Sequence, residues 1–239
     1  MKSILAALAA LTLTAGAMPV YAQEASPLSF NVSVTSDYRY RGISQTRLKP
    51  ALQGGADLAF SNGFYIGTWA STIKWIKDSG GDSKVEVDLY GGYKTEVSPG
   101  LTLDVGLLQY YYPSNKLAVS ANTLEVYGAL SFGPVTAKYS HSTTNLFGFG
   151  DSKGSGYLDV SASFDLGDGL MLSPHIGHQA VKRNSAYSYT DYSLALSKDL
   201  SGFLVSGAIV GTDADKAYVG PGGKDLGKTS FVLSVKKSF

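Results

Sequence analysis

The chain has 239 residues, with 20 lysines and arginines against 19 aspartates and glutamates, so its formal net charge is +1. This balance argues against a nucleic-acid partner, which requires a basic footprint, and the absence of cysteine excludes disulfides and thiolate metal sites. The 28 glycines, 16 tyrosines and 10 phenylalanines, at a mean hydropathy of only +0.02, favour alternating β-strands over membrane-spanning helices.

The N-terminal 22 residues have the pattern of a secretory signal peptide. Lys2 gives a positive start, residues 4–13 are an apolar run too short to span a bilayer, and Ala22 is a small residue at a plausible cleavage position. A retained N-terminal anchor is the alternative. We expect residues 1–22 to be removed and residues 23–239 to form a single domain exported to the bacterial outer membrane.

The segment Leu28–Arg41 alternates apolar and polar residues, as a β-strand with two unlike faces does. Its apolar face ends in Tyr38 and Tyr40, and its polar face ends in Asp37, Arg39 and Arg41. In a membrane, such a strand has lipid on one side and a wet lumen on the other. We therefore expect both tyrosines in an outer aromatic girdle and the three charged residues at the mouth of a lumen.

Further segments show the same alternation along the rest of the chain. They span residues 51–60, 64–71, 84–94, 101–112, 123–132, 135–142, 156–164, 170–179, 190–198, 203–211 and 229–239. Short turns such as Ser61-Asn62-Gly63 alternate with long loops such as 143–155 and 212–228. Outer-membrane barrels arrange periplasmic turns and extracellular loops in this way. The sequence predicts an all-β fold, a transmembrane antiparallel up-and-down β-barrel of about twelve strands.

The last strand places an aromatic residue at position 239. Phe231, Leu233, Val235 and Phe239 share one face of that strand. A terminal aromatic on an alternating strand resembles the signal by which the barrel-assembly machinery recognises outer-membrane barrels. We therefore expect three kinds of partner: that machinery through Phe239, outer-membrane lipid with lipopolysaccharide, and small solutes or ions.

Three stretches carry a resemblance to a known family: Ser36–Thr46, Pro50–Asp57 and Gly63–Ser71. Together they resemble the TorF family of porins, which are proteobacterial outer-membrane proteins. The resemblance is strongest from about residue 30 to 112 and implies an outer-membrane barrel with a pore role. Because the substrates of that family are not established, no site residue is carried over from it.

Strand parity directs a set of charged side chains inward. They are Asp37, Arg39, Arg41, Asp57, Glu86, Asp88, Asp104, Glu125, Lys138, Asp159 and Asp191. One interpretation is a lining that sets ion or solute selectivity. The other is a network of ion pairs and hydrogen bonds that fills a narrow lumen, since buried charges must be paired. Both can hold together, as paired walls around a thin channel.

Catalytic and metal sites are not supported by the sequence. His175 and His178 are three positions apart on one strand, so they point to opposite faces and cannot share an ion. His141 has outward parity, while Ser140 and Ser142 point inward, and no local motif supports a hydrolytic triad. We expect no enzyme activity, no cofactor and no metal. The function predicted is a porin that passes ions or small polar solutes passively; the alternative is a non-conducting barrel whose long loops bind ligands or adhere.

Overall fold

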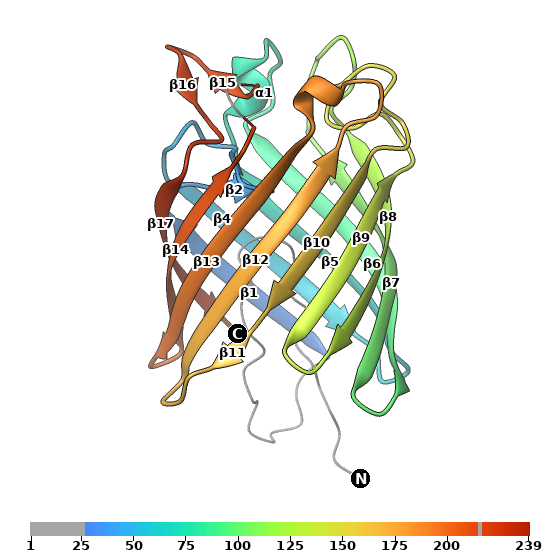
Figure 1. Cartoon of the computed structure of the whole chain (residues 1–239), viewed down its shortest axis with the longest axis vertical. Helices are drawn as coiled ribbons and strands as arrows, with labels where there is room; N and C mark the ends of the chain where they lie inside the picture. The colour runs from blue at the N-terminus through green and yellow to red at the C-terminus, as the bar shows by residue number, and fades with distance from the viewer. Residues whose placement is uncertain (1–26, 215–216) are drawn as a thin grey trace.

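The computed structural model describes residues 27–214 and 217–239, whose main element is a closed antiparallel sheet, beside two small two-stranded sheets (Figure 1). The order of the strands is β10-β9-β8-β7-β6-β5-β4-β1-β17-β14-β13-β12-β11, and β10 also pairs with β12, which closes the sheet into a barrel. Strands β10 (Gly156–Ala162) and β11 (Phe164–Asp165) pair with successive parts of β12 and act as one wall strand. The expected signal peptide, residues 1–22, lies outside the described residues.

Eleven other strands complete a wall of twelve in the described part of the chain. They are β1 (Leu28–Thr35), β4 (Ala51–Ala59), β5 (Phe64–Thr72), β6 (Val85–Ser98), β7 (Leu101–Tyr111), β8 (Thr123–Phe132), β9 (Val135–Ser142), β12 (Leu170–Ala180), β13 (Tyr189–Leu200), β14 (Phe203–Thr212) and β17 (Ser230–Ser238). Strand β1 pairs antiparallel with β17, so the first and last wall strands along the chain are neighbours in the barrel. The prediction of an up-and-down barrel of about twelve strands is confirmed.

Short turns and long loops lie at opposite ends of the barrel, as predicted from their alternation (Figure 1). The loop end carries the short elements β2 (Arg39–Tyr40), β3 (Ile43–Ser44), α1 (Trp75–Asp78), η1 (Ser185–Tyr187), β15 (Val219–Gly220) and β16 (Lys224–Asp225). At the turn end, Gly63 has φ +93°, a conformation that glycine adopts without strain. None of the helices in the described residues is long and apolar enough to cross a bilayer.

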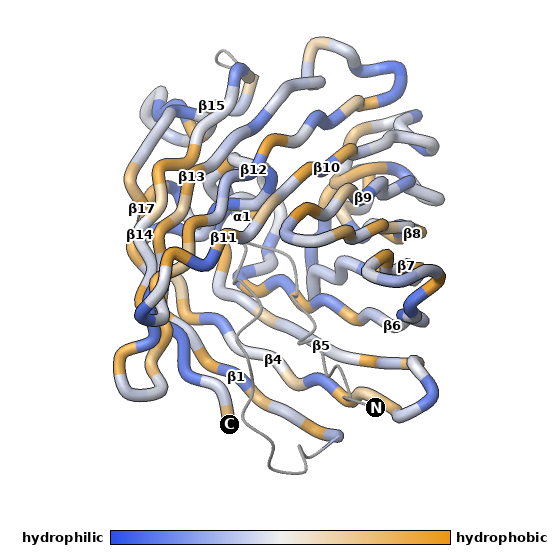
Figure 2. Tube along the Cα trace, turned by 60° about the horizontal axis from the view of Figure 1, so that its bottom comes forward, coloured by the Kyte–Doolittle hydropathy of each residue, from blue (hydrophilic) through white to orange (hydrophobic). Residues whose placement is uncertain are grey.

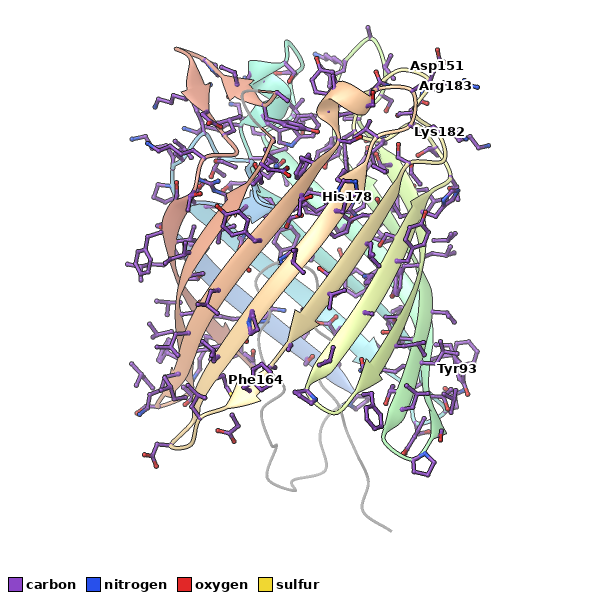
Figure 3. The ribbon with its side chains drawn as sticks, in the orientation of Figure 1. Tyr93, Asp151, Phe164, His178, Lys182 and Arg183 are labelled. Carbon is purple, nitrogen blue, oxygen red and sulfur yellow. The ribbon has the colours of Figure 1, made fainter. Side chains whose placement is uncertain are left out.

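The outer surface of the barrel is apolar, and orange segments alternate with blue along its strands (Figure 2). Exposed phenylalanines cluster near the short turns: Phe60, Phe64, Phe132, Phe164, Phe203 and Phe239. Tyr93 and Phe164 mark this end in Figure 3. Exposed tyrosines lie on the strands toward the loops: Tyr111, Tyr139 and Tyr192. An apolar band between two aromatic rings matches the hydrocarbon layer and interfaces of a membrane.

Candidate functional site

The chain turns into the barrel immediately after β1, and this corrects the predicted strand 28–41. Strand β1 ends at Thr35, and residues 37–46, here called the inner segment, are all buried. Tyr38 and Tyr40 are only 2% and 8% exposed and lie inside the barrel, not in the outer girdle. Arg41 and Gly42 both have positive φ (45° and 79°) between the paired residues Tyr40 and Ile43. This is the geometry of a two-residue hairpin turn of type I′.

Asp37 holds the hairpin together from within. Its carboxylate accepts hydrogen bonds from Ser44 Oγ (2.6 Å) and Thr46 Oγ1 (3.1 Å) and an ion-paired hydrogen bond from Arg39 Nε (2.5 Å). A buried carboxylate with several donors is well satisfied, and each charge-assisted bond is stronger than a neutral one. The inner segment therefore has its own internal support besides its contacts with the wall.

Arg39 and Ser44 fasten the inner segment to the connection between β14 and β17. Arg39 Nη1 donates to the carbonyl oxygens of Gly42 (2.9 Å), Leu226 (3.0 Å) and Lys228 (3.0 Å). The backbone N–H of Ser44 donates to the same Leu226 carbonyl at 2.9 Å. Arg39 and Ser44 thus bind the hairpin to the loop that precedes β17, and these bonds do not involve a wall strand.

Arg41 connects the hairpin to the wall on the far side of the lumen. Its Nη2 lies 2.7 and 3.0 Å from the two carboxylate oxygens of Glu125 on β8, and its Nη1 donates to Gln179 Oε1 on β12 at 2.5 Å. The Cζ atom lies 4.1 Å from the centroid of the Tyr157 ring on β10. The side chains of Arg41 and Glu125 are each 2% exposed. Because both charges are buried, breaking this pair from one side leaves the other charge uncompensated.

The two tyrosines of the inner segment are hydrogen-bonded to glutamates of the wall, Tyr38 directly and Tyr40 through Tyr110. Tyr38 Oη donates to Glu86 Oε1 on β6 at 2.5 Å, and its ring packs edge-on against Trp69 at 5.3 Å between centroids. Tyr40 Oη and Tyr110 Oη are 2.6 Å apart, and Tyr110 Oη lies 3.3 Å from Glu125 Oε2. Of the three consecutive tyrosines Tyr110–Tyr112, only Tyr111 faces outward.

The loop-side half of the lumen is filled around the inner segment. Every wall strand contributes an inward side chain that is at most 5% exposed. These are Thr35, Ala51, Ser71, Glu86, Tyr110, Thr123, Ser140, Tyr157, Gln179, Asp191, Val210 and Val232. Because each of these side chains is buried, the inner segment and the wall together fill this level of the barrel.

Tyrosine hydroxyls also bind the carboxylates elsewhere in the barrel. Tyr65 donates to Asp104 Oδ1 at 2.6 Å, Tyr90 donates to Asp57, and Tyr157 donates to Asp191 at 3.0 and 3.2 Å. Sequence reasoning missed this pairing; the available signal was that these tyrosines share inward parity with the acids on nearby strands.

All eleven predicted lining residues lie inside the barrel, but they do not form one group. The set that meets at the inner segment is Asp37, Arg39, Arg41, Glu86, Asp88, Glu125 and Asp191. Among buried side-chain atoms, Asp88 Oδ1 has no hydrogen-bond partner. Nearer the short turns lie Asp57, Asp104, Lys138 and Asp159. Lys138 Nζ is 3.9 Å from the centroid of the Tyr127 ring.

A cavity of about 500 Å³ lies between the inner segment and the outer loops. Its lining is rich in aromatic residues: Tyr40, Trp75, Tyr112, Phe147, Phe149, Tyr187, Tyr189 and Tyr218. Here this cavity is called the vestibule. Binding pockets for small molecules have volumes of this order and similar lining. The vestibule is therefore the point at which a solute arriving from the loop end would first meet the inner segment.

Ion pairs join the outer loops around the vestibule. Arg47 pairs with Asp78 at the end of α1, and Asp82 lies 3.2 Å from Lys116 Nζ and 3.5 Å from Lys77 Nζ. The hydrogen bond and charge of Lys116, followed by those of Lys77, lower the pKa of the Asp82 carboxyl. Because Asp82, Lys77 and Lys116 are exposed, their pairs orient the loops and add little stability, whereas Asp78 in the Arg47 pair is largely shielded from solvent.

The histidines lie apart from one another. His175 points inward, with Nε2 at 2.6 Å from Asp159 and 3.2 Å from Tyr157 Oη, whereas His178 is exposed and faces outward (Figure 3). Within the described residues, no group of three or more His, Cys, Asp or Glu side chains is arranged to hold a metal ion.

Comparisons place this architecture among known proteins. The family model described as a bacterial protein of unknown function, Gcw_chp, matches residues 21–239. No curated protein matches the sequence significantly. A structure of the KdgM porin is similar, with a TM-score of 0.56 at 8% identity, over 89% of this chain and 98% of that one. The NanC porin gives a TM-score of 0.55 at 10% identity, over 87% and 97%. At such identities the likeness shows the shared barrel fold.

Proposed function

The chain belongs to the Gcw_chp family of bacterial proteins of unknown function, and we propose that it is an outer-membrane porin that passes ions or small polar solutes. The main observation behind this proposal is that the outer and inner surfaces of the barrel wall differ in polarity. Its outside is apolar with aromatic ends, and its inside holds carboxylates, arginines and tyrosine hydroxyls. A lipid-embedded wall around a polar interior is the design of a membrane channel. The similar barrels of the KdgM and NanC porins support it.

The location and partners form part of the same proposal. The signal-like residues 1–22, the aromatic residue Phe239 and the resemblance of 36–46, 50–57 and 63–71 to the TorF porins favour export and assembly in the outer membrane. We propose the barrel-assembly machinery, acting through Phe239, and lipid with lipopolysaccharide as partners. No catalytic role is assigned to the chain.

The inner segment is the gate of the proposed channel. It fills the loop-side lumen, so solutes pass only when it is displaced. Its attachments are polar bonds to the wall and to the loop near Leu226, and such bonds can be exchanged for bonds to water. A vestibule on one side of a polar gate would let a solute collect before it passes.

The filled lumen also supports a second candidate function. A non-conducting barrel that binds ligands through its loops would have a closed interior and an aromatic cavity between its loops, and both features are present. The two functions differ in whether the inner segment moves. Ligand binding at the loops needs no movement, whereas conduction requires it.

Single-channel recording in planar lipid bilayers tests the proposal. The comparison is between the full barrel and a variant in which residues 37–46 are replaced by a short Gly-Ser link. We expect the full barrel to open intermittently and the shortened barrel to conduct continuously. If both are folded and neither conducts, the porin proposal is wrong and loop binding is favoured.

A further inference from the structure

The groups that hold Arg41 bind two of the three nitrogens of its guanidinium, Nη1 and Nη2, from the wall of the barrel, while Nε has no hydrogen-bond partner. Glu125 on β8 binds Nη2 through both carboxylate oxygens, Gln179 on β12 accepts from Nη1, and the face of Tyr157 on β10 lies 4.1 Å from Cζ. A carboxylate, a further acceptor and an aromatic face are the elements that recognise a planar, delocalised cation. These three groups belong to wall strands, whereas the Tyr40 ring, 4.8 Å from Cζ, belongs to the inner segment.

The charge is divided unevenly between the wall and the inner segment. Arg39 and Arg41 are on the inner segment, while the carboxylates Glu86, Asp88, Glu125 and Asp191 are on strands of the wall. When the inner segment withdraws, both guanidinium groups leave with it. The wall keeps its carboxylates, among them Asp88, whose Oδ1 atom has no hydrogen-bond partner even in the closed state. The wall also carries Lys138 on β9, which interacts with Glu125. Four acidic groups against this one ammonium favour a cation in the vacated space.

We propose that Arg41 is the built-in occupant of a cation site on the channel wall, and that solutes bearing a guanidinium group bind there in its place. The proposal rests on the porin function for its role in transport, although binding at the site can be measured without conduction. A solute that reaches Glu125, Tyr157 and Gln179 would compete with Arg41 and thereby favour the open state. The solute would open the gate by taking the place of Arg41 at Glu125, the contact that holds the inner segment across the lumen.

The geometry distinguishes a guanidinium from other ions. An anion would meet carboxylate oxygens and the amide oxygen of Gln179, which are acceptors, so it is repelled. A primary ammonium is a compact point charge, so it cannot fill the Glu125 fork and lie flat on the Tyr157 ring with one planar group. We expect a guanidinium to bind at least about tenfold more tightly than an ammonium of similar size, as one additional charge-assisted hydrogen bond provides.

Removal of the built-in occupant gives the direct test. Arg41→Ala is folded in detergent micelles, and its thermal unfolding midpoint is measured with millimolar methylguanidinium chloride, methylammonium chloride or sodium chloride at equal ionic strength. A ligand that binds only the folded state raises the midpoint. We expect methylguanidinium to raise the midpoint of Arg41→Ala at concentrations about tenfold below those at which methylammonium acts. The wild-type barrel and the double variant Arg41→Ala, Glu125→Gln should show no such difference.

The opposite outcomes overturn the proposal. It is wrong if Arg41→Ala responds equally to the two organic cations, or if the double variant keeps the preference for methylguanidinium. If Arg41→Ala does not fold, the full barrel in a planar bilayer is exposed to butylguanidinium or, as a control of equal charge, to pentylammonium. Butylguanidinium should change the open probability at about one tenth of the pentylammonium concentration, and Glu125→Gln should remove this difference. An equal effect of the two cations would contradict the inference.

These experiments separate the inference from the porin proposal. Conduction without a guanidinium response overturns the inference and leaves the porin function standing. A specific guanidinium response of Arg41→Ala in a barrel that never conducts supports the site and contradicts the porin function.

Discussion

Arg41 and Glu125 are 84 residues apart in sequence and meet inside the barrel through hydrogen bonds of 2.7 and 3.0 Å, each side chain being 2% exposed. This pair joins the end of the inner segment to the wall strand β8. Its state therefore reports whether the inner segment is seated across the lumen.

Glu125→Gln should loosen the gate, because the substitution leaves the buried Arg41 guanidinium without its counter-charge. We expect the open probability in planar bilayers to rise and the free energy of unfolding to fall by about 3–5 kcal/mol. Glu96→Gln, at the turn between β6 and β7, is the matched control and should leave both quantities nearly unchanged. Equal behaviour of the two variants would show that Arg41 does not hold the gate.

Ser140→Cys should report the position of the inner segment, since the natural chain has no cysteine. Ser140 points into the filled level and is 2% exposed, so a charged thiol reagent should label the cysteine slowly. Combining it with the Gly-Ser replacement of residues 37–46 should speed labelling by at least about tenfold, because the replacement exposes the thiol to solvent. Ser120→Cys, in an exposed loop, should react rapidly in both backgrounds. Fast labelling of Ser140→Cys in the intact barrel would mean that the lumen is already open.

Gly42→Ala should unseat the hairpin. Position 42 has φ +79°, and an added Cβ would come within 2.8 Å of Asp191 Cβ and also clash with Thr212. The left-handed backbone alone costs about 1–2 kcal/mol for a residue with a side chain. Gly133→Ala, with φ +56° and no atom near its added Cβ, isolates that backbone cost. Chemical unfolding in micelles should show a larger loss for Gly42→Ala, and only this variant should raise the open probability.

Leu107→Arg should distinguish the lipid face from the lumen face. Leu107 is 52% exposed on the outer surface of β7, and a charge there at mid-membrane costs about 2–4 kcal/mol. Thr102→Arg, on the inward face of the same strand, should cost less, because that face carries the carboxylate of Asp104 and is turned away from lipid. Unfolding from lipid vesicles measures both. A larger cost for Thr102→Arg would contradict the assigned orientation of the barrel faces.

The wall of the barrel was predictable because lipid and lumen impose opposite demands on alternate residues. Leucines and valines such as Leu107 and Val105 therefore mark the outer face along β7. The inward direction of Glu86, Asp88 and Glu125 follows from the same parity. Their hydrogen-bond partners cannot be predicted from parity, since Arg41 and Glu125 are 84 residues apart and meet through the tertiary fold.

The inner segment was mistaken for wall because a hairpin inside a lumen has the same period of two as a wall strand. Tyr38 and Tyr40 continue the alternation of β1 without a break. The overlooked signal was Arg41-Gly42, whose glycine permits the turn at positive φ. An inward tyrosine in a narrow barrel packs against other aromatic rings, and no local pattern separates it from a girdle residue.

The attachment of Arg39 to Leu226 and Lys228 also ties the inner segment to the seam of the barrel. The inner segment leaves directly from β1, and the residues that Arg39 binds stand just before β17. Strands β1 and β17 are the first and last strands of the wall, and they pair with each other. This pairing brings Arg39 close to its acceptors, so the bonds of the hairpin and the seam of the wall support each other. In the proposed porin, a barrel without this seam would lack one anchor of its gate.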